Sequence, residues 1–105
     1  MMQITEYTAL ILIRKNAFYT WLEEAGSKSM EVADSTFKGD HGTYLVKDII
    51  TQKDVFEFLE KNYKKLFKNE LYEWAEPAYW PKELTRELFF HFFEVQVNRQ
   101  VYYAP

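Results

Sequence analysis

The sequence contains no cysteine and no apolar run long enough to cross a bilayer. The first absence excludes disulfides, thiolate nucleophiles and Cys-ligated metal sites, and it fits a reducing compartment. The second excludes a transmembrane helix, which needs roughly 20 consecutive apolar residues. The apolar run from Ala9 to Ile13 lacks a basic leader and a small-residue cleavage site, so we interpret it as a strand. We therefore expect a cytoplasmic protein with no membrane partner.

Glycine is also scarce, with three residues in the chain, and no glycine-rich phosphate loop is present. Asp34, Asp40 and His41 lie near one another in the sequence, but their spacing matches no recognised metal-ligand pattern. His91 stands among four phenylalanines, with no Ser or Cys placed for it to activate. We expect no metal, no cofactor and no catalytic residue.

Aromatic residues, in contrast, are abundant: the chain of 105 residues has three Trp, eight Tyr and nine Phe. A chain of this length forms one domain with a single core, here residues 1–105. The rings exceed what such a core must contain. We therefore expect some of them to line a pocket, a groove or a partner interface.

Negative charge is concentrated towards the C-terminus. The net charge is −3, and the segment from Asn69 to Glu94 has six glutamates against Lys82 and Arg86. Phosphate backbones select clustered Lys and Arg, so this acidic third argues against a nucleic-acid partner. A basic protein surface suits it better.

Hydrophobic periodicity predicts six elements. The first is apolar on both faces, which favours a buried central strand, and the long helix has a capping box at its start. In chain order they are a strand over Tyr7–Ile13, a helix over Ala17–Ala25 capped by Asn16, a strand over Thr43–Ile50, a helix over Thr51–Trp74, a helix over Pro81–Phe93 and a strand over Glu94–Tyr103, with a surface loop over Ser27–Gly42 and a turn over Ala75–Pro81. The order β-α-β-α-α-β predicts an α+β fold, a two-layer sandwich on a three-stranded sheet. A parallel crossover between the first two strands is possible, so the strand order stays open.

Glu70 occupies a position in the long helix where an apolar side chain is expected. At about 100° per residue, the apolar arc of this helix spans roughly 160°, and Glu70 falls near its centre. An isolated buried carboxylate loses solvation, so Glu70 must be paired, hydrogen-bonded, protonated or open to a pocket. Arg99 lies in an otherwise apolar row of the last strand. We predict that Arg99 meets Glu70 across the helix and sheet layers, with Arg14 as the competing partner.

Two roles are open for this ion pair. It could hold the helix on the sheet in one register, which a buried ion pair can do while adding little net stability. Alternatively, it could form a partly open site in which arginine binds an anionic group and Glu70 acts as acceptor or base.

The turn "WAEPAYWP" is the second candidate site, because it combines Trp74, Tyr79 and Trp80 with two prolines and two glutamates. Aromatic turns stiffened by proline lose little entropy on binding and make effective contact surfaces. The competing interpretation is that the tryptophans fill the core where two helices meet.

The segments "FYTWL", "TYLV", "VFEFLEKNYKKLFKNELYEW", "YWP" and "FFEVQV" resemble a family of small uncharacterised bacterial proteins. That family has a "WL" helix, a "YLI" strand, a long helix ending "IF...EL..W", then "WP" and "F..WF.V". The resemblance covers most of the chain outside the Ser27–Gly42 loop and implies no activity. It implies that the family's pattern includes Glu70, Leu71, Trp74, Trp80 and Pro81. Phe92 stands where that pattern has Trp.

These features favour a non-enzymatic protein-binding module that uses its aromatic and acidic C-terminal third, by analogy with small immunity-type or regulatory proteins. The alternative is a small anionic-ligand or enzymatic site around Glu70 and Arg99. A homodimer formed through Phe58, Phe90, Phe93 and Tyr102 is a third possibility. The candidate binding residues are Glu70, Arg99, Arg14, Tyr63, Trp74, Tyr79 and Trp80.

Overall fold

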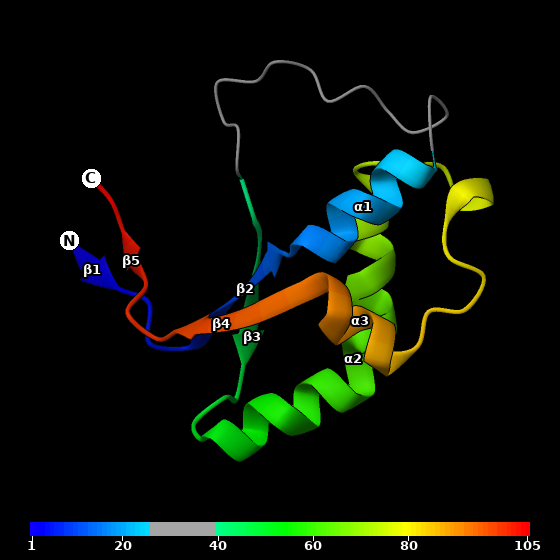
Figure 1. The fold of residues 1–105 in the computed structure, drawn as a ribbon. Helices are drawn as coiled ribbons and strands as arrows, with labels where there is room; N and C mark the ends of the chain where they lie inside the picture. The colour runs from blue at the N-terminus through cyan, green and yellow to red at the C-terminus, as the bar shows by residue number, and fades with distance from the viewer. Residues whose placement is uncertain (26–39) are drawn as a thin grey trace.

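The computed structural model describes residues 1–25 and 40–105, which form three α-helices, one 3₁₀ helix and two small sheets (Figure 1). The predicted α+β class and its two layers are confirmed. The elements are β1 (Met2–Gln3), β2 (Tyr7–Arg14), α1 (Asn16–Glu24), β3 (Gly42–Lys47), α2 (Gln52–Tyr72), the 3₁₀ helix η2 (Pro77–Tyr79), α3 (Arg86–Phe92), β4 (Phe93–Asn98) and β5 (Tyr102–Tyr103). Most of the predicted Ser27–Gly42 loop lies outside the described residues, and Gly42 itself begins β3.

The main sheet has the order β3-β2-β4, and both pairings are antiparallel. The strand order that the sequence left open is thus settled without a parallel crossover. β2 is the central strand, as its apolar character predicts. In its register, Leu12 lies between Gly42 of β3 and Val95 of β4.

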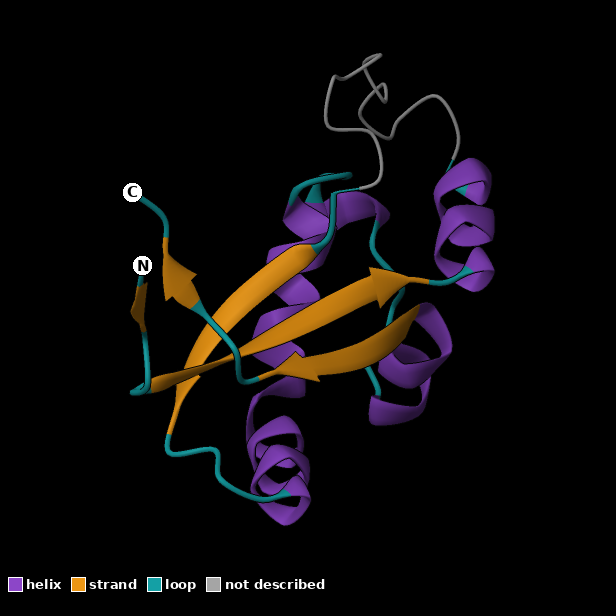
Figure 2. Ribbon diagram, turned by 90° about the vertical axis from the view of Figure 1, so that its left-hand side faces the viewer, coloured by secondary structure: helices purple, strands orange, loops and turns teal. Residues whose placement is uncertain are grey.

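The helices cover one face of this sheet (Figure 2). Successive side chains of a strand point to opposite faces, so Thr8, Leu10, Leu12 and Arg14 of β2 share the helix-covered face. Directly opposite residues in antiparallel strands share a face as well, which adds Gly42, Tyr44 and Val46 from β3. Arg14 therefore comes from the sheet and faces the helical layer.

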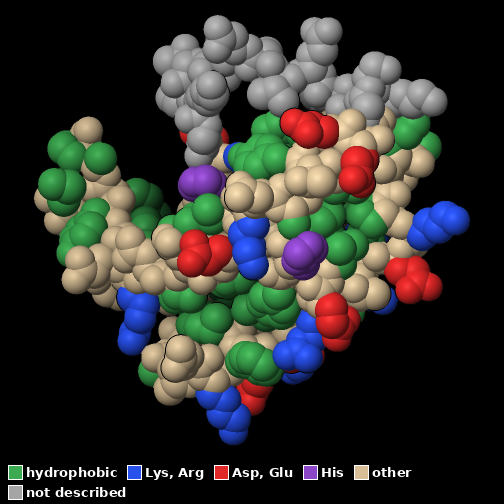
Figure 3. Space-filling model, in the orientation of Figure 1, with side chains coloured by type: hydrophobic (Ala, Val, Ile, Leu, Met, Phe, Trp, Pro, Cys, Tyr) green, Lys and Arg blue, Asp and Glu red, His purple; other side chains and the backbone are tan. Residues whose placement is uncertain are grey.

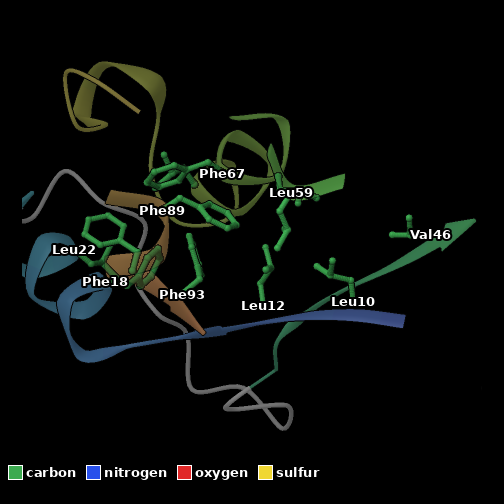
Figure 4. Close-up of a cluster of buried hydrophobic side chains, with 12 residues drawn as sticks. Leu10, Leu12, Phe18, Leu22, Val46, Leu59, Phe67, Phe89 and Phe93 are labelled. Carbon is green, nitrogen blue, oxygen red and sulfur yellow. The ribbon is translucent and has the colours of Figure 1, made fainter. Parts of the chain in front are cut away.

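Aromatic rings fill the space between the layers (Figure 4). Phe67 of α2 is fully buried and contacts the rings of Phe89, Phe92 and Phe93 at centroid distances of 5.6, 5.7 and 5.7 Å. Phe18 of α1 closes the cluster against Phe93. Much of the aromatic content is thus used by the core. Phe93, one of the rings suggested for a homodimer surface, is buried here, and Phe58 and Phe90 pack against the same cluster.

The long helix α2 begins as the sequence predicts. The Thr51 hydroxyl accepts a hydrogen bond from the Asp54 amide, and the Asp54 carboxylate accepts one from the Thr51 amide, which is a complete capping box. The ribbon of α2 changes direction about halfway along (Figure 1). Asn62 donates its side-chain amide to the Phe58 carbonyl, the carbonyl four residues earlier, and such competition for a helical acceptor bends helices. The C-terminal half of α2, which carries Glu70, then crosses over the sheet.

Several predicted boundaries are wrong. The strand predicted over Thr43–Ile50 ends at Lys47. The last helix begins at Arg86 and not at Pro81, because the Thr85 hydroxyl caps it by accepting from the Leu88 amide, while Pro77 begins the separate 3₁₀ turn. The predicted Asn16 cap is the first residue of α1, and Lys15 takes the cap position without a side-chain hydrogen bond to the first turn of the helix.

The final strand is also shorter than predicted. It ends at Asn98, whose side-chain oxygen accepts a hydrogen bond from the Gln100 amide, and the chain turns there. The residues that follow form β5, which pairs with β1 in a ribbon that stands apart from the main sheet (Figure 1). Within the described ranges, no helix combines the length and the apolar character needed to cross a membrane.

Candidate functional site

Glu70 lies directly over Gly42, at the point where α2 crosses β3. A Cβ atom on Gly42 would overlap Glu70 Oε2, far inside van der Waals contact. The carboxylate therefore occupies the space that a side chain at position 42 would need. Glu70 is 4 % exposed, so the prediction that it sits within the apolar face of the helix is confirmed.

The Glu70 carboxylate has partners on both neighbouring strands. The Tyr44 hydroxyl of β3 donates a hydrogen bond to Glu70 Oε2 at 2.5 Å, and Asn69 donates its side-chain amide to the Tyr44 oxygen at 2.9 Å. Arg14 Nη1 of β2 lies 3.9 Å from Glu70 Oε1. We call Glu70, Tyr44, Arg14 and Gly42 the Glu70 cluster. It joins α2 to two strands of the sheet.

Arg14 is held from several sides. Its Nε donates to the Tyr19 hydroxyl at 3.2 Å, and its Nη2 donates to the Asp40 carbonyl. Its guanidinium carbon lies 4.8 Å from the centre of the Trp74 ring, in cation–π geometry. The side chain is only 7 % exposed. Arginine suits such a place because its planar fork can use several acceptors and a ring face at once.

The predicted pairing of Glu70 with Arg99 is wrong, and the competing partner, Arg14, is confirmed. Arg99 lies after the end of β4, is exposed, and donates from Nη1 to the Ile50 carbonyl at 3.2 Å. The prediction placed Arg99 on the inner face because apolar residues alternate along this part of the sequence. That alternation continues past Asn98, where the strand ends. Tyr44, which completes the cluster, was not predicted as a site residue. The sequence did offer one signal. Tyr44 lies two residues after Gly42, so in a strand both residues are on the same face.

Burial raises the pKa of Glu70 above its ordinary value of 4.5, although the Tyr44 hydrogen bond and the Arg14 charge oppose this change. The charge of Glu73 adds to the rise, and that of His41 opposes it. Burial also raises the pKa of Tyr44, and its hydrogen bond to Glu70 adds to that rise, so Tyr44 stays a hydrogen-bond donor at physiological pH.

The raised pKa of Glu70 predicts a pH dependence of stability. Between pH 4.5 and the raised pKa, Glu70 binds more protons in the folded protein than in the unfolded chain, so the free energy of unfolding should fall as pH rises through this interval. Asp54 does not interfere, since its lowered pKa removes stability only below 3.8. Urea unfolding between pH 4.5 and 8 should show this decline in the wild type and not in Glu70→Gln. Parallel curves for the two proteins would refute the raised pKa.

The Glu70 cluster and the surface grooves are separate. In the described part of the chain, two surface grooves lie elsewhere, and neither is lined by Glu70 or Arg14. The arrangement fits the first of the two roles considered for the ion pair, in which it holds α2 on the sheet in one register.

The larger groove contains other candidate residues. It runs between the C-terminal half of α2 and the segment 77–87, with a volume of about 780 Å³. It includes Tyr63 and Trp80, which the sequence singled out, together with four cationic and two acidic side chains. We call this site the basic groove; its lining is Tyr63, Lys64, Lys68, Pro77, Trp80, Pro81, Lys82, Glu83, Leu84, Thr85, Arg86 and Glu87.

The charge of this groove differs from that of the sequence segment beside it. Lys64 and Lys68 come from α2, and they join Lys82 and Arg86 against Glu83 and Glu87, so the lining carries a net +2. Glu70 is withdrawn into the core. The predicted acidic third is therefore not one acidic surface. Figure 3 shows basic and acidic side chains interspersed on the side of the molecule where this segment runs.

Arg86 is fixed in the wall of the groove. Its Nε lies 2.6 Å from Glu60 Oε1, and its guanidinium carbon lies 5.5 Å from the Phe56 ring centre and 5.9 Å from that of Phe90. The ion pair is about half exposed, so we assign it a positioning effect and little stability. The buried Nε has no hydrogen-bond partner in residues 1–25 and 40–105, so its contact with Glu60 is an ion pair without hydrogen-bond geometry.

The aromatic turn belongs to both the core and the groove. Trp74 packs against the hydrophobic cluster beneath Arg14, and Tyr79 is half-buried. Trp80 also packs against the cluster, and its indole N–H donates to the Ala75 carbonyl at 2.9 Å. Trp80 also lines the basic groove.

No group of three or more acidic or histidine side chains able to hold a metal ion is found in the described part of the chain, and Asp34 lies outside it. The resemblance to a bacterial family stays a prediction. Comparison of the chain with protein-family models, curated proteins and solved structures found no match.

Proposed function

We propose that the protein is a non-enzymatic cytoplasmic module that binds another protein through the basic groove. The observation that carries the proposal is the lining of the groove, where Trp, Tyr, Arg and Pro side chains lie beside charges of both signs. Aromatic residues and arginine are enriched in protein interfaces, and a polar rim around them is typical.

The wall formed by residues 77–87 supports this function because contacts within the chain restrict its conformation. Pro77 and Pro81 restrict the backbone, the Trp80 indole is tied to Ala75, and the Trp80 ring contacts the Tyr72 ring at 4.6 Å. A surface that is rigid before binding loses little conformational entropy when a partner arrives. The segment is therefore suited to contact with another macromolecule.

A small anionic ligand is the competing function, and the four cationic side chains favour it. Its place would be the basic groove and not the predicted surroundings of Glu70 and Arg99. Small-ligand sites usually bury most of their ligand in an enclosed, mainly apolar pocket. The basic groove is open and lined by many charged groups, which fits a macromolecular partner better.

Site-specific photo-crosslinking in the native cell tests the proposal. A photoreactive amino acid at Lys82, in the groove, should capture one discrete protein, and the same residue at Lys61, an exposed α2 position outside the groove lining, should not. The adduct at position 82 should disappear when Arg86→Glu is added, because the reversed charge changes the groove wall. Equal capture from both positions, or capture that survives Arg86→Glu, would contradict binding through this groove.

A further inference from the structure

The spacing of cations along the basic groove specifies a class of partner. Lys64 and Lys68 are four residues apart on α2, so their backbone positions differ by about 6 Å along the helix axis and their side chains share one stripe. Alternate side chains of an extended peptide on one face repeat at roughly 6.6 Å. Two carboxylates at alternate positions of such a peptide therefore match the two lysines.

The opposite wall offers complementary donors. Lys82 and Arg86 lie on the segment that faces α2 across the groove. The Arg86 guanidinium is held by Glu60 through Nε and by the rings of Phe56 and Phe90, and its terminal nitrogens are the pair that binds a carboxylate in bidentate form. Tyr63 and Trp80 supply aromatic contact area for side chains between the acidic ones.

We propose that the basic groove binds an extended acidic segment of a partner protein, with Glu or Asp at alternate positions and apolar residues between them. This inference rests on the proposed protein-binding function and names the chemistry of its partner. Glu83 and Glu87 within the lining oppose ligands of dense negative charge such as nucleic acid or polyphosphate. A peptide, whose carboxylates are spaced and interrupted by apolar groups, avoids much of this repulsion.

Nuclear magnetic resonance titration of the ¹⁵N-labelled full chain tests this inference. The probe is a blocked octapeptide with Glu at alternate positions and Leu or Ala between them. The comparison probes are the same peptide with Lys in place of Glu, and inorganic tripolyphosphate. The Glu peptide should shift the amide signals of residues 63–68 and 80–87 and the Trp80 indole signal. Its apparent affinity should fall as salt is added, because exposed charges are screened.

Two charge-reversal variants of α2 provide the matched control. Lys64→Glu/Lys68→Glu should weaken binding of the Glu peptide at least about tenfold, which corresponds to roughly 1.4 kcal/mol. Lys61→Glu/Lys65→Glu makes the same change at the same spacing on the same helix, outside the groove lining, and should change the affinity less than about twofold. Unchanged dispersion of the amide spectrum shows that each variant is folded.

Results other than these would each contradict one part of the proposal. Equal weakening by both variants, or shifts spread outside the groove, would refute the assigned site. Tripolyphosphate that binds as tightly as the Glu peptide would refute a peptide ligand in favour of a small anion. A Glu peptide that does not bind, while crosslinking at position 82 still captures a protein, would refute the acidic class alone and leave protein binding supported.

Discussion

Replacing Glu70 with alanine is expected to lower the free energy of unfolding by about 3–5 kcal/mol, the range typical of breaking a buried ion pair from one side. The reason is that Arg14, with 7 % of its side chain exposed, would keep its charge without the carboxylate 3.9 Å away. The Tyr44 hydroxyl would also lose the acceptor to which it donates. Urea unfolding at pH 7, followed by circular dichroism, measures the change. A loss below about 1 kcal/mol would mean that the cluster is not a stabilising unit, since 1 kcal/mol is an ordinary effect for any substitution.

Gly42 supplies an internal control for the same cluster. In the wild type, Gly42→Ala should destabilise strongly, because the new Cβ would collide with Glu70 Oε2. In the Glu70→Ala background the collision is removed, so adding Gly42→Ala should cost little. The double-mutant cycle should therefore show a coupling energy in the range of about 0.5–3 kcal/mol that contacting residues reach. Additive effects would show that the carboxylate does not occupy the space over Gly42.

Replacing Phe67 with alanine is the second large effect. Phe67 is fully buried and contacts three phenylalanine rings that belong to α3 and the start of β4. Deletion of a buried phenylalanine side chain costs about 3–5 kcal/mol, because transfer free energy is lost and a cavity remains. We expect a loss in this range, measured by urea unfolding under the same conditions.

Phe56→Ala is the matched control for that change, since Phe56 lies on the same helix and is 57 % exposed. It should cost less than about 1 kcal/mol, most of it from the contact between its ring and the Arg86 guanidinium. If the two variants lost similar stability, the core would not be centred on Phe67.

Local pattern predicted most of the elements. The apolar Tyr7–Ile13 run became the central strand, and the Thr51 and Asp54 capping box set the first residue of the long helix. These predictions are confirmed because periodicity and capping depend on residues within one or two turns of each other. The position of Glu70 on the apolar face of α2 follows from the same rule.

The predicted ends of helices and strands were wrong where two local sequence signals competed. Pro81 can begin a helix, but Thr85 caps α3 four residues later. The alternating pattern beyond Asn98 continues as far as Tyr103, yet a turn at Asn98 divides it between two sheets. Arg99 falls on that turn, which is why its predicted role in the Glu70 cluster failed.

The basic groove illustrates a different limit. Tyr63 and Trp80 were both candidate site residues, but they are 17 positions apart, and the sequence placed Trp80 in an acidic segment. Folding brings Lys64 and Lys68 of α2 beside Lys82 and Arg86 and removes Glu70 from the surface. The local charge of a segment therefore did not predict the charge of the surface to which it contributes.

The amino-acid order alone determined which segments are helical or extended, which faces are apolar, and that one carboxylate lies where solvation is lost. Tertiary structure alone decided that Arg14 and Tyr44 are the partners of that carboxylate, that Gly42 leaves it room, and that four cations gather in one groove. The two kinds of feature differ in the sequence separation of the residues that determine them. Periodicity acts between neighbours along the chain, whereas a charge is paired or left free by strand ends, register and helix direction, which are set by contacts between distant residues.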